Sequence, residues 1–272
     1  MQDVFFLTCG LLRAPAFAVG PSVRVSPLRS VSLSLTVGVV LRADGDLVLV
    51  DAGWSAQACA SPIRTIGPAR WAYVAPRIRP EDAIAAQLRR LGFDPHRVRT
   101  IVATHLHLDH VGGVEDFPNA EVVCTDLELA AYRARKHLGY RAADLAKAGR
   151  IRTISMTSDP SYGFPSSHDL FGDGGVVMLD ARGHTRGNVA VALRSDRGCY
   201  VHIGDAAYQG WEYGLGGKGP SLLARVGGWD TPSVKRAHAN IRACQADPRR
   251  PIIVPSHDRD VLDALPRAPL TN

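Results

Sequence analysis

The most informative segment of this chain is Thr104-His105-Leu106-His107-Leu108-Asp109-His110-Val111-Gly112-Gly113. It follows a predicted strand, and it places three histidines and one aspartate close together. In extended backbone, residues i and i+2 share a face, so the imidazoles of His105 and His107 can reach one metal ion. Asp109 and His110 lie where the chain turns, which lets them point to a second ion. Partly buried His and Asp side chains are costly without partners, so a purely structural cluster is a poor explanation.

Further candidate ligands lie downstream, each after an apolar run or a Gly or Pro turn. They are His184, Asp205 and His257. Loops at strand ends are where functional residues usually lie. Each of the three alone is more often an ordinary loop or cap residue, so only their order and context favour metal binding. Imidazole and carboxylate ligands suit Zn²⁺ best, although Mn, Fe or Co can bind such sets.

The remaining histidines are interpreted as structural. His202 precedes Ile203 in a predicted strand, which indicates packing on a strand face. The others have no motif around them and are expected on the surface or in the core; they are His96, His137, His168 and His238.

The pattern of apolar residues predicts an α/β chain. Short apolar runs predict strands at Val4–Leu7, Ser32–Leu41, Leu47–Val50, Arg99–Ala103, Glu121–Cys124, Val176–Leu179, Asn188–Leu193, Cys199–Ile203 and Ile252–Val254. Helices are predicted from Pro80 to a stop at Gly92, at Leu127–Lys136, at Ala142–Ala148, and from an N-cap at Thr231. Residues 54–79 and 150–175 are expected to be irregular. No linker divides the chain, so we expect one domain over residues 1–272, with two sheets packed between helices.

Composition excludes several classes of protein. Hydrophobic residues make up 46% and charged residues 21%, which is typical of a globular chain and not of a disordered one. The net charge of +6 raises the question of nucleic acid, but the arginines are scattered and lack interleaved aromatic residues. We therefore expect no nucleic-acid partner.

The compartment is predicted from cysteine usage and hydropathy. The five cysteines are widely spaced, without a C-x-x-C motif, which favours a reduced compartment. The apolar run Val4–Leu12 is too short to cross a bilayer and lacks the preceding positive charge of a signal peptide. We expect a cytoplasmic protein that does not associate with a membrane.

The histidine-rich segment resembles the H-x-H-x-D-H signature of the metallo-β-lactamase superfamily. Other motifs of that superfamily are matched in the same order by Val50-Asp51-Ala52-Gly53, Gly183-His184-Thr185, Gly204-Asp205-Ala206 and Ser256-His257-Asp258. The resemblance spans from about residue 4 to residue 258. It implies a four-layer αββα sandwich with the metal site at one edge between the sheets. Loop and helical inserts, the helical one at about 126–148, would lie over the active site.

The same resemblance implies a ligand set. One ion would bind His105, His107 and His184, a second would bind Asp109, His110 and His257, and Asp205 would bridge them. Two divalent ions, zinc foremost, can share a bridging hydroxide and polarise a carbonyl, so the expected reaction is hydrolysis. The fold alone cannot choose among the lactones, thioesters, β-lactams, phosphodiesters and organophosphates that the superfamily hydrolyses.

One feature favours a lactonase. Asp205-Ala206-Ala207-Tyr208 looks like the D-x-x-Y motif of N-acyl-homoserine lactone lactonases. By that resemblance Tyr208 would hydrogen-bond the substrate carbonyl and stabilise the oxyanion, and Asp109 would pass a proton to the leaving alkoxide. We expect opening of N-acyl-homoserine lactones, that is, quorum quenching. The alternatives are thioesters (as in glyoxalase II), aryl esters and phosphotriesters.

The chain departs from the family pattern around the substrate. Arg186 stands where the family usually has Pro, and Asn188 stands where His or Gln is common. The Gly-rich segment 209–229 has no obvious counterpart. Four aromatic residues are candidates for an acyl pocket, although each can equally be core: Trp71, Tyr73, Trp211 and Trp229. The expected partner is a small lactone or ester, and a homodimer is left open.

Overall fold

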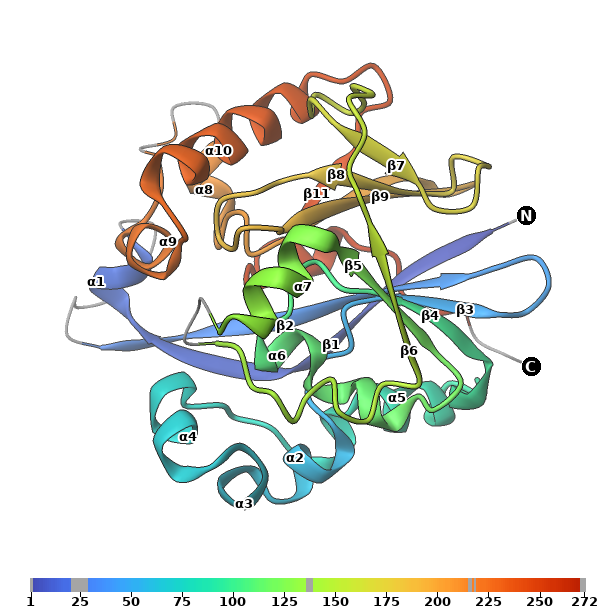
Figure 1. The fold of residues 1–272 in the computed structure, drawn as a ribbon, viewed down its shortest axis with the longest axis vertical. Helices are drawn as coiled ribbons and strands as arrows, with labels where there is room; N and C mark the ends of the chain where they lie inside the picture. Colours follow the sequence, from blue (N-terminus) through green and yellow to red (C-terminus); the bar gives the residue numbers. More distant parts are fainter. Residues whose placement is uncertain (1, 21–28, 136–138, 215–216, 218, 270–272) are drawn as a thin grey trace.

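In a computed structural model of the chain, two β-sheets pack face to face, with helices on both outer sides (Figure 1). The structure describes residues 2–20, 29–135, 139–214, 217 and 219–269. The expected αββα sandwich is confirmed. No helix among the described residues combines the length and the apolarity that a bilayer-spanning segment needs.

The first sheet has six strands in sequence order. They are β1 (Asp3–Pro15), β2 (Ser30–Leu41), β3 (Leu47–Val50), β4 (Val98–Val102), β5 (Glu121–Thr125) and β6 (Arg150–Ile154). Strands β3 to β6 run parallel, whereas β1 and β2 are antiparallel to their neighbours. Because parallel strands end at one edge, the segments after β3 and β4 emerge side by side.

The second sheet has five strands in the order β11-β10-β9-β8-β7. They are β7 (Ser167–Asp169), β8 (Val176–Asp180), β9 (Val189–Ser195), β10 (Gly198–Gly204) and β11 (Ile252–Pro255). This sheet is antiparallel except for β11, which pairs in parallel with β10. Strands β10 and β11 therefore also end at a common edge.

Alternating side chains separate three apolar layers. On β3, Leu49 packs toward the outer helices and Val48 packs between the sheets. On β8, Met178 packs between the sheets and Leu179 packs toward helix α10. Both sheets are thus covered on both faces, which is why their strands are continuous apolar runs in the sequence.

The helices occupy the outer layers and the connections. They are α1 (Ala16–Val19), α2 (Ala56–Ala60), α3 (Pro62–Ile66), α4 (Pro68–Val74), α5 (Ile84–Arg90), α6 (Leu108–Val111), α7 (Asp126–Arg133), α8 (Gly210–Tyr213), α9 (Leu222–Gly227) and α10 (Thr231–Gln245). Short 3₁₀ turns lie at Pro80–Asp82, Pro95–Arg97, Gly112–Asp116 and Leu262–Ala264.

The prediction of an irregular segment at 54–79 is wrong, because this region contains α2, α3 and α4. Ser55 caps α2 by accepting from the Ala58 N–H at 3.1 Å, and α3 and α4 each begin with proline. Helices this short complete fewer than two turns, so they leave no apolar repeat for sequence analysis to detect.

Three further expectations are corrected. Residues 142–148 form turns instead of a helix, because the Arg141 guanidinium bonds to the Asp144 carboxylate and to the Thr65 carbonyl oxygen and fixes a turn there. The segment 150–175 contains β6 and β7; β6 joins the sheet by parallel backbone pairing with β5, and the Arg152 Nε donates to the Glu121 carboxylate at 2.8 Å. Helix α10 is capped by Asp230 and not by Thr231, because the Asp230 carboxylate accepts from the Ser233 N–H at 2.8 Å.

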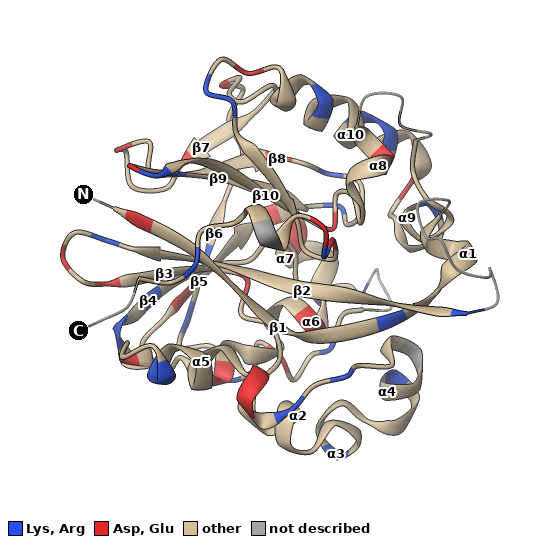
Figure 2. Ribbon diagram, turned by 180° about the vertical axis from the view of Figure 1, so that it is seen from behind, with Lys and Arg blue, Asp and Glu red and all other residues tan. Residues whose placement is uncertain are grey.

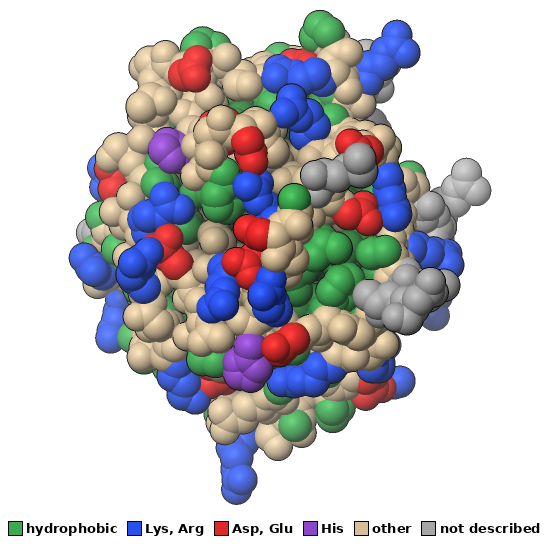
Figure 3. Space-filling model, turned by 90° about the vertical axis from the view of Figure 1, so that its right-hand side faces the viewer, with side chains coloured by type: hydrophobic (Ala, Val, Ile, Leu, Met, Phe, Trp, Pro, Cys, Tyr) green, Lys and Arg blue, Asp and Glu red, His purple; other side chains and the backbone are tan. Residues whose placement is uncertain are grey.

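Charged residues are spread over helices, turns and strand ends (Figure 2). On the face shown in Figure 3, basic and acidic groups are intermixed and leave no continuous basic area on that face. The charged groups on that face are thus mixed in sign, as on an ordinary solvated surface.

Candidate metal centre

The fold brings the seven predicted ligands to one edge between the two sheets. The segment from β4 to α6 carries His105, His107, Asp109 and His110; His184 lies between β8 and β9, Asp205 follows β10, and His257 follows β11. All seven side chains are buried. Residues far apart in the sequence therefore form one cluster, because the carboxyl ends of four strands meet there.

The first group is made of three imidazoles. His107 Nδ1 lies 3.0 Å from His105 Nε2 and 3.1 Å from His184 Nε2. These three nitrogens lie within 4.8 Å of one another, as three ligands of one ion would. A neutral imidazole carries one hydrogen, so its other nitrogen offers a lone pair to a metal.

The second group is made of Asp109, His110 and His257, whose ligand atoms also lie within 4.8 Å of one another. The Asp109 Oδ2 atom is 3.7 Å from His110 Nε2 and 3.9 Å from His257 Nε2. Burial raises the pKa of Asp109, and the nearby carboxylate of Asp205 raises it further, while His110 acts in the opposite direction. A carboxylate placed here is more easily kept ionised beside a cation.

Asp205 stands between the two groups and presents one oxygen to each. Its Oδ1 atom lies 3.2 Å from both His110 Nε2 and His257 Nε2. Its Oδ2 atom lies 3.5 Å from His184 Nε2 and 4.0 Å from His105 Nε2. Although burial alone would raise its pKa, His257 and His110 hold the pKa of Asp205 well below the usual range. One carboxylate thus faces both ligand groups.

The chemistry of this cluster fits two divalent cations. His110 Nε2 and Asp205 Oδ1 are fully buried, and neither makes a hydrogen bond of good geometry to any described residue. Burying polar atoms without hydrogen bonds raises the free energy of the folded protein, and a cation bound between them removes that penalty. Five imidazoles and two carboxylates are a nitrogen and oxygen set suited to zinc-like ions.

Asp51 and Ser34 orient two of the imidazoles from behind. The Asp51 Oδ2 atom lies 2.7 Å from His110 Nδ1, and the Ser34 carbonyl oxygen lies 2.6 Å from His257 Nδ1. A hydrogen on each Nδ1 leaves the Nε2 lone pair pointing at the cluster. The sequence motif around Asp51 signalled its position but not this role, and Ser34 gave no signal because it acts through its backbone.

Glu128, in the first turn of α7, holds two ligand segments together. Its Oε1 atom accepts from the Leu106 N–H and its Oε2 atom from the Gly187 N–H, at 2.9 and 3.1 Å. The hydroxyls of Tyr140 and Thr185 donate to the same carboxylate. Glu128 carries no signal in the sequence, because an acidic residue in a first helical turn looks like an ordinary charge at the positive end of a helix.

A cavity of about 240 Å³ opens beside the cluster and is lined by five of its seven residues. Its floor includes His107, Asp109, Asp205 and His257, together with Tyr208. Its walls are largely aliphatic, from β1, β2, α4 and α9, and include Leu12, Ala14, Pro15, Leu33, Val74 and Leu223. The site thus combines a polar floor with apolar walls.

Tyr208 lies where the D-x-x-Y motif predicts it, beside the cluster. Its ring stacks on His257, with centroids 5.4 Å apart and planes 13° apart. It also meets the edge of the His184 ring, at 5.9 Å between centroids. The residue is buried and lines the cavity.

The tryptophans predicted for the acyl pocket lie elsewhere. Trp71 is 36% exposed on α4, and the Trp211 ring covers Gly20. Trp229 is 40% exposed and lines a different cavity, while the side chain of Tyr73 is outside the described part. Aliphatic side chains form most of the wall of the cavity over the cluster, a role that their sequence context does not reveal.

The histidines interpreted as structural stay apart from the cluster where they are described. His202 is buried between the sheets with Nε2 3.0 Å from the Thr36 carbonyl oxygen, and His238 is buried on α10. His96 is exposed and His168 is half-buried. His137 lies outside the described residues.

Comparisons with known proteins agree with this geometry. The family model of the metallo-β-lactamase superfamily matches residues 34–257. A probable metallo-hydrolase of Mycobacterium tuberculosis is 35% identical over 74% of this chain and 68% of its own length. The N-acyl homoserine lactonase AttM of Azorhizobium caulinodans is 30% identical over 49% of this chain and 50% of its own.

A solved structure of an N-acyl homoserine lactone hydrolase, with the product N-hexanoyl-L-homoserine at its metal centre, has the same fold. It superposes with a TM-score of 0.75 over 97% of this chain and 96% of its own, at 18% identity. The resemblance seen in the motifs is confirmed, and the chain belongs to the metallo-β-lactamase superfamily, as a hydrolase of that family.

Proposed function

We propose that this protein is a di-metal lactonase that opens N-acyl-homoserine lactones. The observation that carries the proposal is Asp205, which faces both ligand groups at the floor of a cavity that also presents Tyr208. The relatives named as lactonases support this choice of substrate. Apolar walls above a polar floor suit a molecule with an acyl tail and a polar ring.

Two divalent ions at these residues would supply Lewis acidity and acidify water near neutral pH. His105, His107 and His184 would hold one ion, and Asp109, His110 and His257 would hold the other, with Asp205 shared. The chain's own contribution is to fix these ligands in a buried site, where the Asp51 carboxylate and the Ser34 carbonyl oxygen accept from imidazole N–H groups and set the imidazole orientations.

Tyr208 and Asp109 would act on the substrate directly. The Tyr208 hydroxyl would donate a hydrogen bond to the lactone carbonyl oxygen, which gains negative charge as water adds. Asp109 would then pass a proton to the ring oxygen as the bond between that oxygen and the carbonyl carbon breaks. The Asp109 carboxylate gains that proton beforehand, from the water as its oxygen bonds to the carbonyl carbon, so Asp109 is ionised again when the ring-opened hydroxy acid has formed.

The test is proton release from N-hexanoyl-homoserine lactone by metal-loaded protein. We expect turnover that a chelator abolishes and added metal restores. Tyr208→Phe should lower kcat by about 100-fold with little change in KM, because the hydroxyl acts mainly on the transition state. Tyr200→Phe, a buried tyrosine of β10 between the sheets, is the matched control and should leave kcat unchanged.

Two results would contradict the proposal. One is the absence of chelator-sensitive turnover on any lactone. The other is a higher kcat/KM for a thioester, an aryl ester or a phosphotriester measured in a parallel panel.

We also propose zinc as the ion, the cytoplasm as the location and one domain over residues 1–272. The donor set supports zinc, and the five free cysteines support a reducing compartment. The ligand positions, from His105 to His257, support one domain because neither half of the chain contains the whole set. Elemental analysis of protein purified without added metal tests the first of these, with two zinc ions per chain expected.

A further inference from the structure

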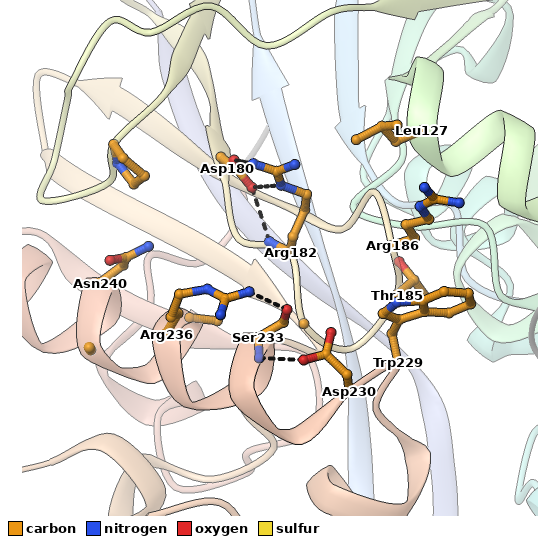
Figure 4. A pocket seen from close by; sticks show the side chains of 14 residues that line it. Leu127, Asp180, Arg182, Thr185, Arg186, Trp229, Asp230, Ser233, Arg236 and Asn240 are labelled. Atoms are coloured by element: carbon orange, nitrogen blue, oxygen red, sulfur yellow. Dashed lines mark hydrogen bonds and ion pairs between the residues drawn. The ribbon is translucent and has the colours of Figure 1, made fainter.

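A second cavity, of about 510 Å³, lies behind the loop that carries His184 (Figure 4). Its walls come from that loop, from α7 and from α10. Gly183 and Thr185 line this cavity, whereas the His184 side chain between them lines the cavity over the metal cluster. The two cavities therefore lie on opposite sides of one loop, and the proposed lactonase reaction does not use the second.

The second cavity contains more positive charge than its own acids neutralise. Three arginines and two aspartates line it. Arg182 forms an ion pair with Asp180, and its Nε lies 2.8 Å from Oδ1. The Asp230 carboxylate caps α10. Arg186 and Arg236 form no ion pair with any carboxylate of the described chain; Arg236 donates to the Ser233 hydroxyl instead. Two guanidinium groups are thus available to a carboxylate or phosphate.

The cavity also offers a flat apolar surface. The Trp229 indole is 40% exposed, and the Arg186 guanidinium lies 5.8 Å from its ring centroid. Leu127 and Ala237 add aliphatic surface nearby, and the Asn240 amide can both donate and accept. An exposed indole beside a guanidinium favours a planar ring, which can stack on both.

The backbone of Trp229 is bonded to the loop that carries His184. The Trp229 backbone N–H donates to the carbonyl oxygens of Gly183 and His184, at 2.8 and 3.0 Å. These bonds fix the start of the connection to α10 against the loop, so the backbone that carries the indole is anchored. Preformed cavities of several hundred Å³ with few convergent polar groups are typical of small-molecule sites.

We propose that this cavity binds a small organic anion with a planar ring, of about the size of a nucleoside monophosphate. Arg186 and Arg236 attract its phosphate or carboxylate, and its ring stacks on Trp229. The proposal is independent of the lactonase assignment, because it uses none of the metal-cluster residues.

Adenosine monophosphate is the probe, titrated into metal-loaded protein by calorimetry and by tryptophan fluorescence. We expect saturable binding and a fluorescence change. The Arg186→Gln/Arg236→Gln double variant should weaken binding about tenfold or more, because both charge-assisted contacts are lost. Arg242→Gln, on the same helix but outside the cavity, should bind as the wild type does. Trp229→Phe should remove the fluorescence change, whereas Trp71→Phe should keep it.

A phosphate can also bind a di-metal centre, so the variants must separate the two sites. Full affinity in the double arginine variant would overturn the proposal and place the nucleotide elsewhere. Equal affinities for inorganic phosphate and adenosine monophosphate would overturn the role of the ring. Absence of saturable binding to the wild-type protein would overturn the proposal as a whole.

Discussion

Asp51 occupies a backbone conformation that most residues avoid, with a φ of +64° directly after β3. Its carboxylate is fully buried and accepts from the Thr104 N–H at 2.8 Å and from the Thr104 hydroxyl at 2.9 Å, besides facing His110. Strained residues persist where the surrounding contacts over-determine them. Here those contacts fix the start of the ligand segment relative to β3.

The same carboxylate affects the charge of His110. Burial alone would lower the pKa of His110, but the carboxylates of Asp205, Asp51 and Asp109 raise it well above its usual value. A cation bound at His110 would supply the positive charge that the extra proton on its imidazole otherwise supplies. Asp51 therefore matters to the metal site although it is not among the ligands.

We predict that Asp51→Asn loosens metal binding by about 10–100-fold, because the amide nitrogen cannot accept from His110 Nδ1. Asn tolerates positive φ better than other non-glycine residues, so the backbone strain changes little. The measurement is competition with a chromogenic chelator. Asp44→Asn, in the exposed hairpin turn after β2, is the control and should keep wild-type affinity. Unchanged metal affinity in Asp51→Asn would refute the orienting role.

At the scale of elements, α7 is the part that joins the two sheets' ligand segments. Its Glu128 carboxylate accepts from Leu106, which lies beside two candidate ligands of the first sheet. It also accepts from Thr185 and Gly187, which lie beside His184 of the second sheet. Burial raises the pKa of Glu128, and the donors around it act to lower the pKa. The Glu128 carboxylate thus accepts hydrogen bonds from four donors, which belong to three separate segments of the chain.

We predict that Glu128→Gln lowers the free energy of unfolding by about 1–3 kcal/mol for each buried donor left unpaired. A glutamine amide keeps one acceptor oxygen, so at least one of the paired donors loses its partner. Urea denaturation of the metal-loaded protein measures the change. Glu81→Gln, at an exposed site, should change stability by less than about 0.5 kcal/mol. Equal stabilities of the two variants would contradict the role of Glu128.

Elements differ in how well the sequence predicts them. Strands buried on both faces, such as β3 and β8, were predicted closely, because unbroken apolar runs bounded by turns leave few alternatives. Strand β6 was missed, since its exposed arginines conceal the pattern, and its place is set by backbone pairing with β5. Short helices depend on their caps and neighbours more than on periodicity.

At the scale of the whole molecule, the layered packing sequesters almost every thiol. Four of the five cysteines are buried, and only Cys199 is half-buried. Burial raises the pKa of Cys124 and of Cys244 to about 12, and it also raises the pKa of Cys199. The thiolate is the reactive form, so buried thiols should react slowly.

We predict that one cysteine per chain reacts with an aromatic disulfide reagent in the native protein, and that all five react after unfolding. Cys199→Ser should remove the fast phase, because the four remaining thiols lie in closed apolar layers. Cys244→Ser is the comparison variant and should leave that phase in place. Two or more fast-reacting thiols in the native protein would mean that a layer opens readily.

The sequence by itself determined the superfamily, the ligand types and the strands that deliver them, because metal chemistry demands His and Asp at fixed spacings and buried strands demand apolar runs. Only the tertiary structure decided the rest. It placed Asp205 between two ligand groups, put Ser34, Asp51 and Glu128 behind them, and lined the cavity with aliphatic side chains instead of the tryptophans. Those roles depend on contacts between residues distant in the chain, and no local pattern of one sequence encodes such contacts.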